Sequence, residues 1–158
     1  MNVKKIAKVA FIVVGVVFVL IQFFQPSRTN PEIDQSITMQ SELNIPAEIS
    51  ALLERGCKDC HSNQTSWPFY SYVAPVSWLV SSDVTEGRKK FNMSEWGKYK
   101  LSKKASRLSG IYQAVNDRAM PLPQYILLHP VANFTDAERN QLAAWAQQET
   151  EKLMGGEE

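Results

Sequence analysis

The chain has 158 residues, and its 17 Lys and Arg residues nearly balance its 16 Asp and Glu residues, for a formal net charge of +1. It contains 2 cysteines, Cys57 and Cys60, which excludes a larger disulfide framework. The chain shows no internal repeat, and after its N-terminal segments it is long enough for one compact domain of roughly a hundred residues.

Residues 1–24 predict an uncleaved signal anchor that would cross a membrane. Three lysines precede residues 9–24, which are apolar except for Gln22. A cleavable signal should end in a small-residue site, and this run lacks one. Lysines before the run predict a cytoplasmic N-terminus. We therefore expect a single-pass protein of the bacterial inner membrane, with the rest of the chain in the periplasm. A cleaved signal and a soluble periplasmic protein form the alternative.

Residues 25–44 are polar, contain two prolines and predict a tether. Residues 45–158 then form the functional domain. Apolar residues recur there at helical spacing in four segments, which are 46–57, 76–91, 98–117 and 135–153. Thr135 and Glu138 have the spacing of a capping box at the start of the last segment. Strict alternation of apolar and polar residues is absent, so the predicted fold class is all-α.

The five residues from Cys57 to His61 read CKDCH and match the CxxCH attachment site of a c-type haem. In such a site two thiols, here those of Cys57 and Cys60, form thioether links to the porphyrin. The neighbouring imidazole of His61 binds the iron as the proximal ligand. The motif therefore predicts one covalently bound haem c as the cofactor.

Three other interpretations of these residues remain open. A zinc site could use Cys57, Cys60, His61 and His129, which are all the Cys and His residues of the chain. Adjacent residues rarely fill two corners of one tetrahedron, which disfavours zinc. A thioredoxin-like CxxC would need a βαβ setting, which the sequence does not suggest. A plain disulfide between Cys57 and Cys60 would leave His61 unexplained.

The second axial position of the iron would decide between an electron carrier and a ligand-binding protein. Met120 is the preferred distal ligand, because the following Pro121 and Pro123 restrict the backbone and aim its thioether with little loss of entropy. His129 is the runner-up. Trp67, in a segment dense in aromatic and proline residues, and Arg88, as a partner of a haem propionate, are the expected pocket residues.

Several motifs occur in one order along the chain. They are 57–63 (CKDCHSN), 67–71 (WPFYS), 73–78 (VAPVSW), 83–88, Asn92 with 94–96, 120–123 (MPLP), and Tyr125 with 129–130. From about residue 45 to residue 146 the chain resembles the bacterial haem-binding domain family of cytochrome c-like proteins. The resemblance implies one haem in a cytochrome c-like helical fold, thioether links at Cys57 and Cys60, and ligation by His61 and Met120. It also implies an exported and often membrane-anchored protein.

These features favour one-electron transfer through a haem with His and Met ligands, by a protein that is not an enzyme. The alternatives are a haem-based ligand-binding or sensing module, a weak peroxidase with a displaceable distal ligand, or a scaffold whose haem serves folding only. Residues 88–107 hold 8 basic residues against Glu95 alone. This asymmetry predicts an acidic redox protein as partner, whereas nucleic acid is not expected.

Overall fold

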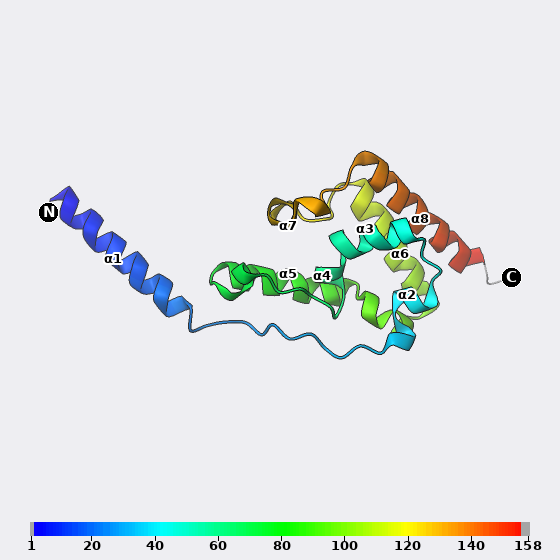
Figure 1. Ribbon diagram of the computed structural model, residues 1–158, viewed down its shortest axis with the longest axis horizontal. Coiled ribbons are helices and arrows are strands. Elements are labelled where there is room, and N and C mark those ends of the chain that lie inside the picture. The colour runs from blue at the N-terminus through cyan, green and yellow to red at the C-terminus, as the bar shows by residue number, and fades with distance from the viewer. Residues whose placement is uncertain (1, 156–158) are drawn as a thin grey trace.

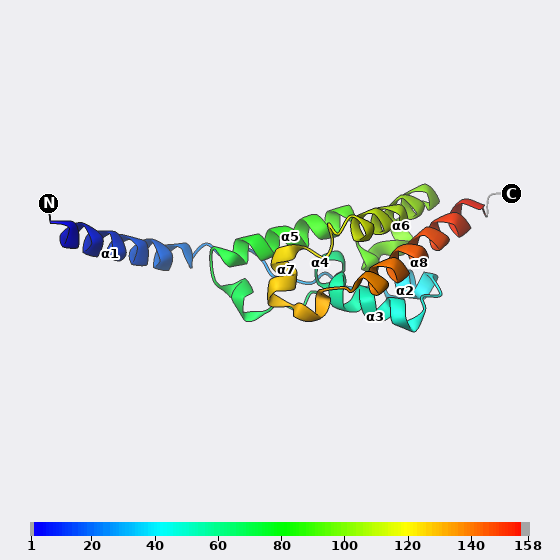
Figure 2. The same cartoon turned by 90° about the horizontal axis from the view of Figure 1, so that it is seen from above.

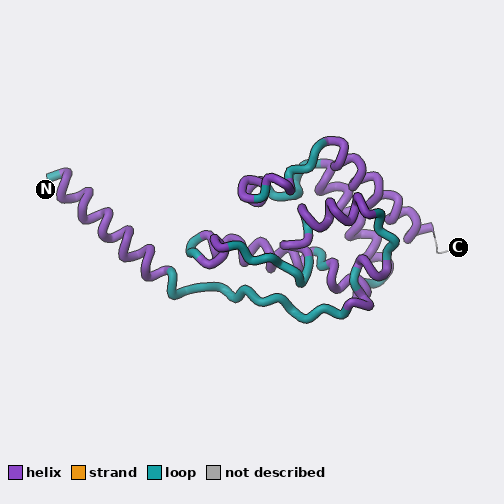
Figure 3. Tube along the Cα trace, in the orientation of Figure 1, coloured by secondary structure: helices purple, strands orange, loops and turns teal. Residues whose placement is uncertain are grey.

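The computed structural model describes residues 2–155, and every regular element in this range is a helix (Figures 1 and 3). The α-helices are α1 Val3–Ile21, α2 Met39–Glu42, α3 Ala47–Gly56, α4 Lys58–His61, α5 Val76–Lys90, α6 Leu101–Asn116, α7 Pro123–Leu128 and α8 Asp136–Gly155. The 3-10 helices are η1 Gln35–Ile37, η2 Phe69–Tyr72, η3 Met93–Lys98 and η4 Pro130–Ala132. The predicted all-α class is confirmed.

The helix α1 projects away from the other helices and buries none of its residues (Figure 1). Within residues 2–155, no helix combines the length and the apolar character needed to cross a bilayer. Three lysines lie inside α1, and the helix ends at Ile21 rather than at Phe24. Its apolar part, residues 9–21, therefore rises about 20 Å, against a hydrocarbon core of about 30 Å. This finding corrects the expected single-pass inner-membrane location.

The polar segment after α1 runs along the domain before it reaches α2 (Figure 1). The Gln22 side chain donates to the Ala74 carbonyl at 3.1 Å and accepts from the Ala74 N–H at 2.9 Å. The Trp78 indole donates to the Phe24 carbonyl at 2.6 Å, and Arg28 donates to the Ser71 carbonyl at 3.2 Å. These bonds hold the predicted tether against η2 and the start of α5. The proposed boundaries 1–24, 25–44 and 45–158 stay a prediction.

The hydrophobic core lies where α6 and α8 pack side by side and α3 contacts α8 (Figure 2). Its most deeply buried large side chains include Met39, Leu53, Trp96, Leu108 and Leu142. The start of α8 has the predicted capping box: the Thr135 N–H donates to Glu138 Oε2 at 2.8 Å, and the Glu138 N–H donates to Thr135 Oγ1 at 3.3 Å.

Sequence periodicity predicted the long helices α3, α5, α6 and α8 well but not the short ones. Pro121 and Pro123 were predicted to restrict the backbone, and the residue between them, Leu122, is extended. Helix α7 then begins at Pro123, because the ring presets a helical φ and the missing N–H costs nothing in the first turn. This helix brings Gln124 and Tyr125 toward α5 and α4.

Candidate functional site

The CxxCH residues form one short turn, α4, which follows α3 directly and lies against α5. Cys57 is the residue between the two helices, and its carbonyl accepts from the His61 N–H at 2.9 Å. Gly87 of α5 permits the close approach: a Cβ added there would lie 2.4 Å from the Cys60 carbonyl oxygen and 3.1 Å from Cys60 Cβ. Because the nearest atoms belong to the backbone, a side chain at residue 87 would displace the motif.

Both cysteines of the motif are free thiols in the structure. They are three residues apart, which is one helical turn, so the two side chains emerge on neighbouring parts of one surface. Burial raises the pKa of the Cys57 thiol to about 12 and that of Cys60 to about 11. Burial therefore disfavours the thiolate form of both groups.

The ring of His61 is held in one tautomer by two backbone carbonyls. Its Nδ1 lies 3.1 Å from the Gly87 oxygen and 3.1 Å from the Phe91 oxygen. Carbonyl oxygens only accept hydrogen bonds, so Nδ1 carries the proton and Nε2 keeps its lone pair. Burial lowers the pKa of His61, although the two carbonyl contacts oppose this shift. The structure thus presents a neutral imidazole with a fixed orientation, as a metal-binding histidine requires.

Met120 is positioned by hydrogen bonds to its own backbone. Its N–H donates to the Ala114 carbonyl at 3.0 Å, and its carbonyl accepts from Arg139 Nη1 at 2.8 Å. These bonds attach the segment after α6 to both α6 and α8. The side chain is half-buried. Two helices, and not only the prolines, fix the position of the Met120 backbone.

Two neighbouring cavities contain both His61 and Met120. The first has a volume of about 290 Å³ and lies between α3, the end of α5, and α6. The second has a volume of about 230 Å³ and lies between α5 and the segment that leads into α7. They share Gly56, His61, Lys90 and Met120. We call the two cavities together the His61–Met120 cleft.

The residues of the cleft fit a haem in their chemistry. The α6 wall presents Ser106, Gly110 and Ala114 at successive turns, and a Cβ added at Gly110 would meet no heavy atom within 4 Å. The donors at the cleft are an imidazole nitrogen, a thioether and the thiols of Cys57 and Cys60. This is the donor set of a c-type haem with His and Met ligands.

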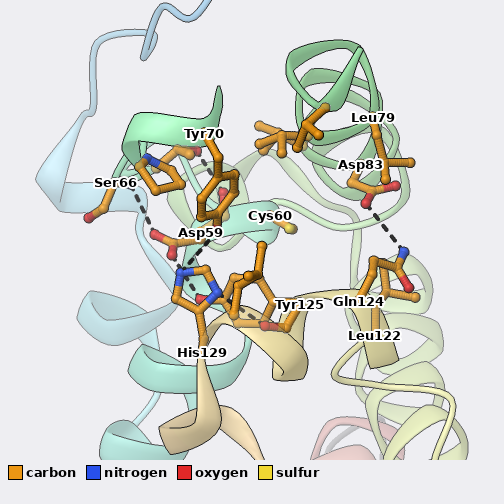
Figure 4. A pocket seen from close by; sticks show the side chains of 16 residues that line it. Asp59, Cys60, Ser66, Tyr70, Leu79, Asp83, Leu122, Gln124, Tyr125 and His129 are labelled. Carbon is orange, nitrogen blue, oxygen red and sulfur yellow. Dashed lines mark hydrogen bonds between the residues drawn. The ribbon is translucent and has the colours of Figure 1, made fainter. Parts of the chain in front are cut away.

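A third cavity, of about 80 Å³, contains His129 but neither His61 nor Met120 (Figure 4). His129 Nδ1 lies 3.1 Å from the Tyr125 carbonyl, and its Nε2 lies 3.3 Å from the Tyr70 hydroxyl. The ring also stacks on Tyr125 at 4.1 Å between centroids. The Tyr125 hydroxyl in turn donates to Asp59 Oδ2 at 2.8 Å. The structure therefore gives both ring nitrogens of His129 a protein partner.

Trp67 and Arg88, the two expected pocket residues, are not among the residues that line the cleft. Arg88 Nε donates to the Ser62 carbonyl at 2.8 Å, and its Nη2 donates to Asn30 Oδ1 and Thr65 Oγ1, each at 2.8 Å. These bonds connect Ser62 and Thr65, which follow the motif, to Asn30 in the N-terminal segment. The Trp67 indole nitrogen is buried and has no hydrogen-bond partner in the described part of the chain.

The four residues of the zinc interpretation are not gathered around one point. Across residues 2–155, no group of three or more His, Cys, Asp or Glu side chains is arranged to hold a metal ion. His129 in particular is held by Tyr70 and Tyr125.

Sequence reasoning missed three residues of the site: Gly87, Lys90 and Arg107. A signal existed for Gly87, because glycine inside a helix costs about 1 kcal/mol relative to alanine and often marks a close approach. Lys90 and Arg107 line the first cavity. They are two of the eight basic residues between positions 88 and 107, and nothing in the sequence distinguishes them from the other six.

Comparison with known proteins agrees with this geometry. The sequence model of a family described as "Haem-binding domain" matches residues 16–148. The chain belongs to this haem-binding domain family. It is also similar to cytochrome c peroxidase Ccp of Escherichia coli (strain K12), with 27% identity over 126 residues. That alignment covers 78% of this chain but 27% of the peroxidase, so the chain spans only about a quarter of the relative's length. No solved structure matches the chain significantly.

Proposed function

We propose that this haem-binding protein is a monohaem c-type electron carrier, with thioether links at Cys57 and Cys60, His61 as proximal ligand and Met120 as distal ligand. One observation carries the proposal: His61 and Met120 line the same two cavities, directly beside the two thiols. When bound, the haem supplies a one-electron couple between ferric and ferrous iron. The all-helical domain supports a cytochrome c-like arrangement around it.

The residues of the chain would keep this centre rigid and free of substrate. The Gly87 and Phe91 carbonyls hold the His61 ring, and Arg139 with Ala114 holds the Met120 backbone. Two ligands from fixed elements would leave the iron no open position, and rigidity limits the reorganisation that accompanies each electron transfer.

An acidic redox protein remains the proposed partner. Of the eight basic residues, Lys89, Lys98 and Lys104 are already paired with Glu86, Glu95 and Glu42.

A methionine substitution tests the distal ligand. The purified protein should have a low-spin spectrum with a sulfur-to-iron charge-transfer band, and Met120→Ala should abolish that band. Met154→Ala is the matched control, because Met154 is 66% exposed near the end of α8. A band that survives in Met120→Ala would assign the distal position to another residue.

A second candidate function is peroxide reduction or the binding of small ligands at a displaceable distal position. The similarity to a cytochrome c peroxidase favours it. In this case the ferrous protein should bind carbon monoxide rapidly at neutral pH and the ferric protein should consume hydrogen peroxide. Slow or absent carbon monoxide binding would favour the electron carrier.

A further inference from the structure

Two basic side chains, Lys90 and Arg107, line the first cavity of the His61–Met120 cleft. Lys90 ends α5, and Arg107 lies on the face of α6 that also presents Ser106 and Gly110. The described lining of this cavity includes no carboxylate, although Asp83 and Glu86 line the second one. The lining of the first cavity, which is mostly apolar, thus includes two positively charged side chains.

Arg107 lacks the partners that every other described arginine has. Its Nε is buried, and its N–H donates to no protein acceptor within residues 2–155. A buried donor left without an acceptor destabilises the fold, and a charged donor does so more strongly. The Nε donor of Arg107 is therefore left without an acceptor in the described part of the chain.

The other arginines make clear that this is unusual. Arg55 pairs with Glu138, and Arg118 pairs with Asp136 at 2.6 Å. Arg139 also has a buried, unpartnered Nε, but its Nη1 donates to the Met120 carbonyl, and the residue does not line the cleft. Arg88 is fully engaged by oxygens of the protein. Among the described arginines, Arg107 alone combines a buried, unpartnered Nε with a position in the cleft.

We propose that Arg107, assisted by Lys90, binds a propionate carboxylate of the haem. The inference rests on the proposed function, because it needs a haem in the cleft. Propionates are the anionic groups at the edge of an otherwise apolar porphyrin. A guanidinium binds a carboxylate through charge-assisted hydrogen bonds in a fixed geometry, which supplies the acceptor that Nε lacks. Arg107 is thus a positioning residue that sets the orientation of the haem edge.

This pairing would also act on the iron. Positive charge near the propionate disfavours the more positive ferric state, so its removal should lower the midpoint potential. Arg107→Gln removes the charge and keeps much of the length. Arg107→Lys keeps the charge but loses the planar fork of donors. Arg118→Gln is the matched control, because Arg118 is exposed and pairs with Asp136 away from the cleft.

The test compares full-length holoprotein of these variants by redox titration and by resonance Raman spectroscopy of the propionate bending mode. We expect Arg107→Gln to shift that mode and to lower the potential. Arg107→Lys should restore most of the potential but not the mode, and Lys90→Gln should have a smaller effect. Arg118→Gln should change neither quantity.

The outcomes separate this inference from the function on which it rests. Wild-type protein without covalent haem would contradict the proposed function. Covalent haem with an unchanged mode and potential in Arg107→Gln would contradict the propionate assignment alone. If Arg107→Gln does not accumulate, Arg107→Lys decides, because an unchanged bending mode in that variant would also overturn the assignment.

Discussion

The two histidines of the chain have similar local partners and different chemical capacities. His61 Nδ1 faces the Gly87 and Phe91 carbonyls, which leaves Nε2 without a protein partner in the described range. His129 Nδ1 also faces a carbonyl, that of Tyr125, but its Nε2 is taken by the Tyr70 hydroxyl. A single hydrogen bond at Nε2 therefore separates a histidine that can bind a metal from one that joins a structural network.

The surroundings of the two rings reinforce this difference. His61 lines both cavities of the cleft together with Met120, whereas His129 lines a cavity with Asp59, Tyr70 and Tyr125. Ligand capacity thus depends on which atoms the neighbouring elements offer to each ring nitrogen. Four experiments can break or sharpen the comparison.

Replacement of each histidine should have the largest and most unequal effects. His61→Ala should abolish the low-spin spectrum, because it removes the proposed proximal ligand while the proposed thioether links remain. His129→Ala should keep the spectrum and lose about 1–3 kcal/mol of unfolding free energy with its hydrogen bonds. Absorbance spectroscopy measures the haem spectrum, and urea unfolding measures the free energy of unfolding. The reverse pattern would exchange the two assignments.

Gly87→Ala should have the next largest effect, because it changes the contacts that position His61 and leaves those of His129 intact. The added Cβ would lie 2.4 Å from the Cys60 carbonyl oxygen, so the α4 turn must move, at a cost of about 1–3 kcal/mol. We expect a lower yield of holoprotein and a lower unfolding midpoint. Gly15→Ala is the control, since its Cβ would meet no atom within 4 Å. Equal yields from the two variants would argue against the close approach.

Tyr125→Phe should perturb the His129 network and leave the proposed axial ligands in place, although Tyr125 also lines the second cavity of the cleft. It removes the 2.8 Å hydrogen bond to Asp59, and a typical protein hydrogen bond contributes about 1 kcal/mol. Urea unfolding should report that loss while the haem spectrum stays unchanged. A change in the axial-ligand spectrum would show that the two regions are coupled.

The pH dependence of stability should give the smallest effect. Burial, followed by the hydrogen bond to Asp59, raises the pKa of Tyr125 above its ordinary value. An unfolded tyrosine loses its proton near pH 10, so the folded state binds more protons above that pH. The contribution of Tyr125 is therefore complete below about pH 10 and declines as the pH rises further. Urea unfolding across this range should show a shallower decline for Tyr125→Phe. If stability declined as steeply with pH in Tyr125→Phe as in the wild type, the raised pKa of Tyr125 would be contradicted.

The sequence was informative wherever the signal is local. The capping box at Thr135 and Glu138 forms as predicted, and the periodicity of α5 and α6 was read correctly. The CxxCH motif predicted a haem protein, which the family match confirms. The covalent links and the axial ligands remain predictions.

The sequence was uninformative or misleading where tertiary contacts decide. Arg88 and Arg107 are the same residue type in one basic run, and only the fold engages the first with protein oxygens and leaves the second in the cleft. The apolar run after the lysines was read as a membrane span. The helix ends at Ile21, where the chain turns and Gln22 bonds to Ala74.

The mass of the denatured polypeptide tests the central claim most directly. The full chain would be produced in cells competent in cytochrome c maturation, denatured in acidified acetone and examined by mass spectrometry with its peptide around Cys57 and Cys60. We predict a polypeptide heavier by one haem, with both added bonds on that peptide. A colourless polypeptide with the mass of its amino acids alone would contradict the account.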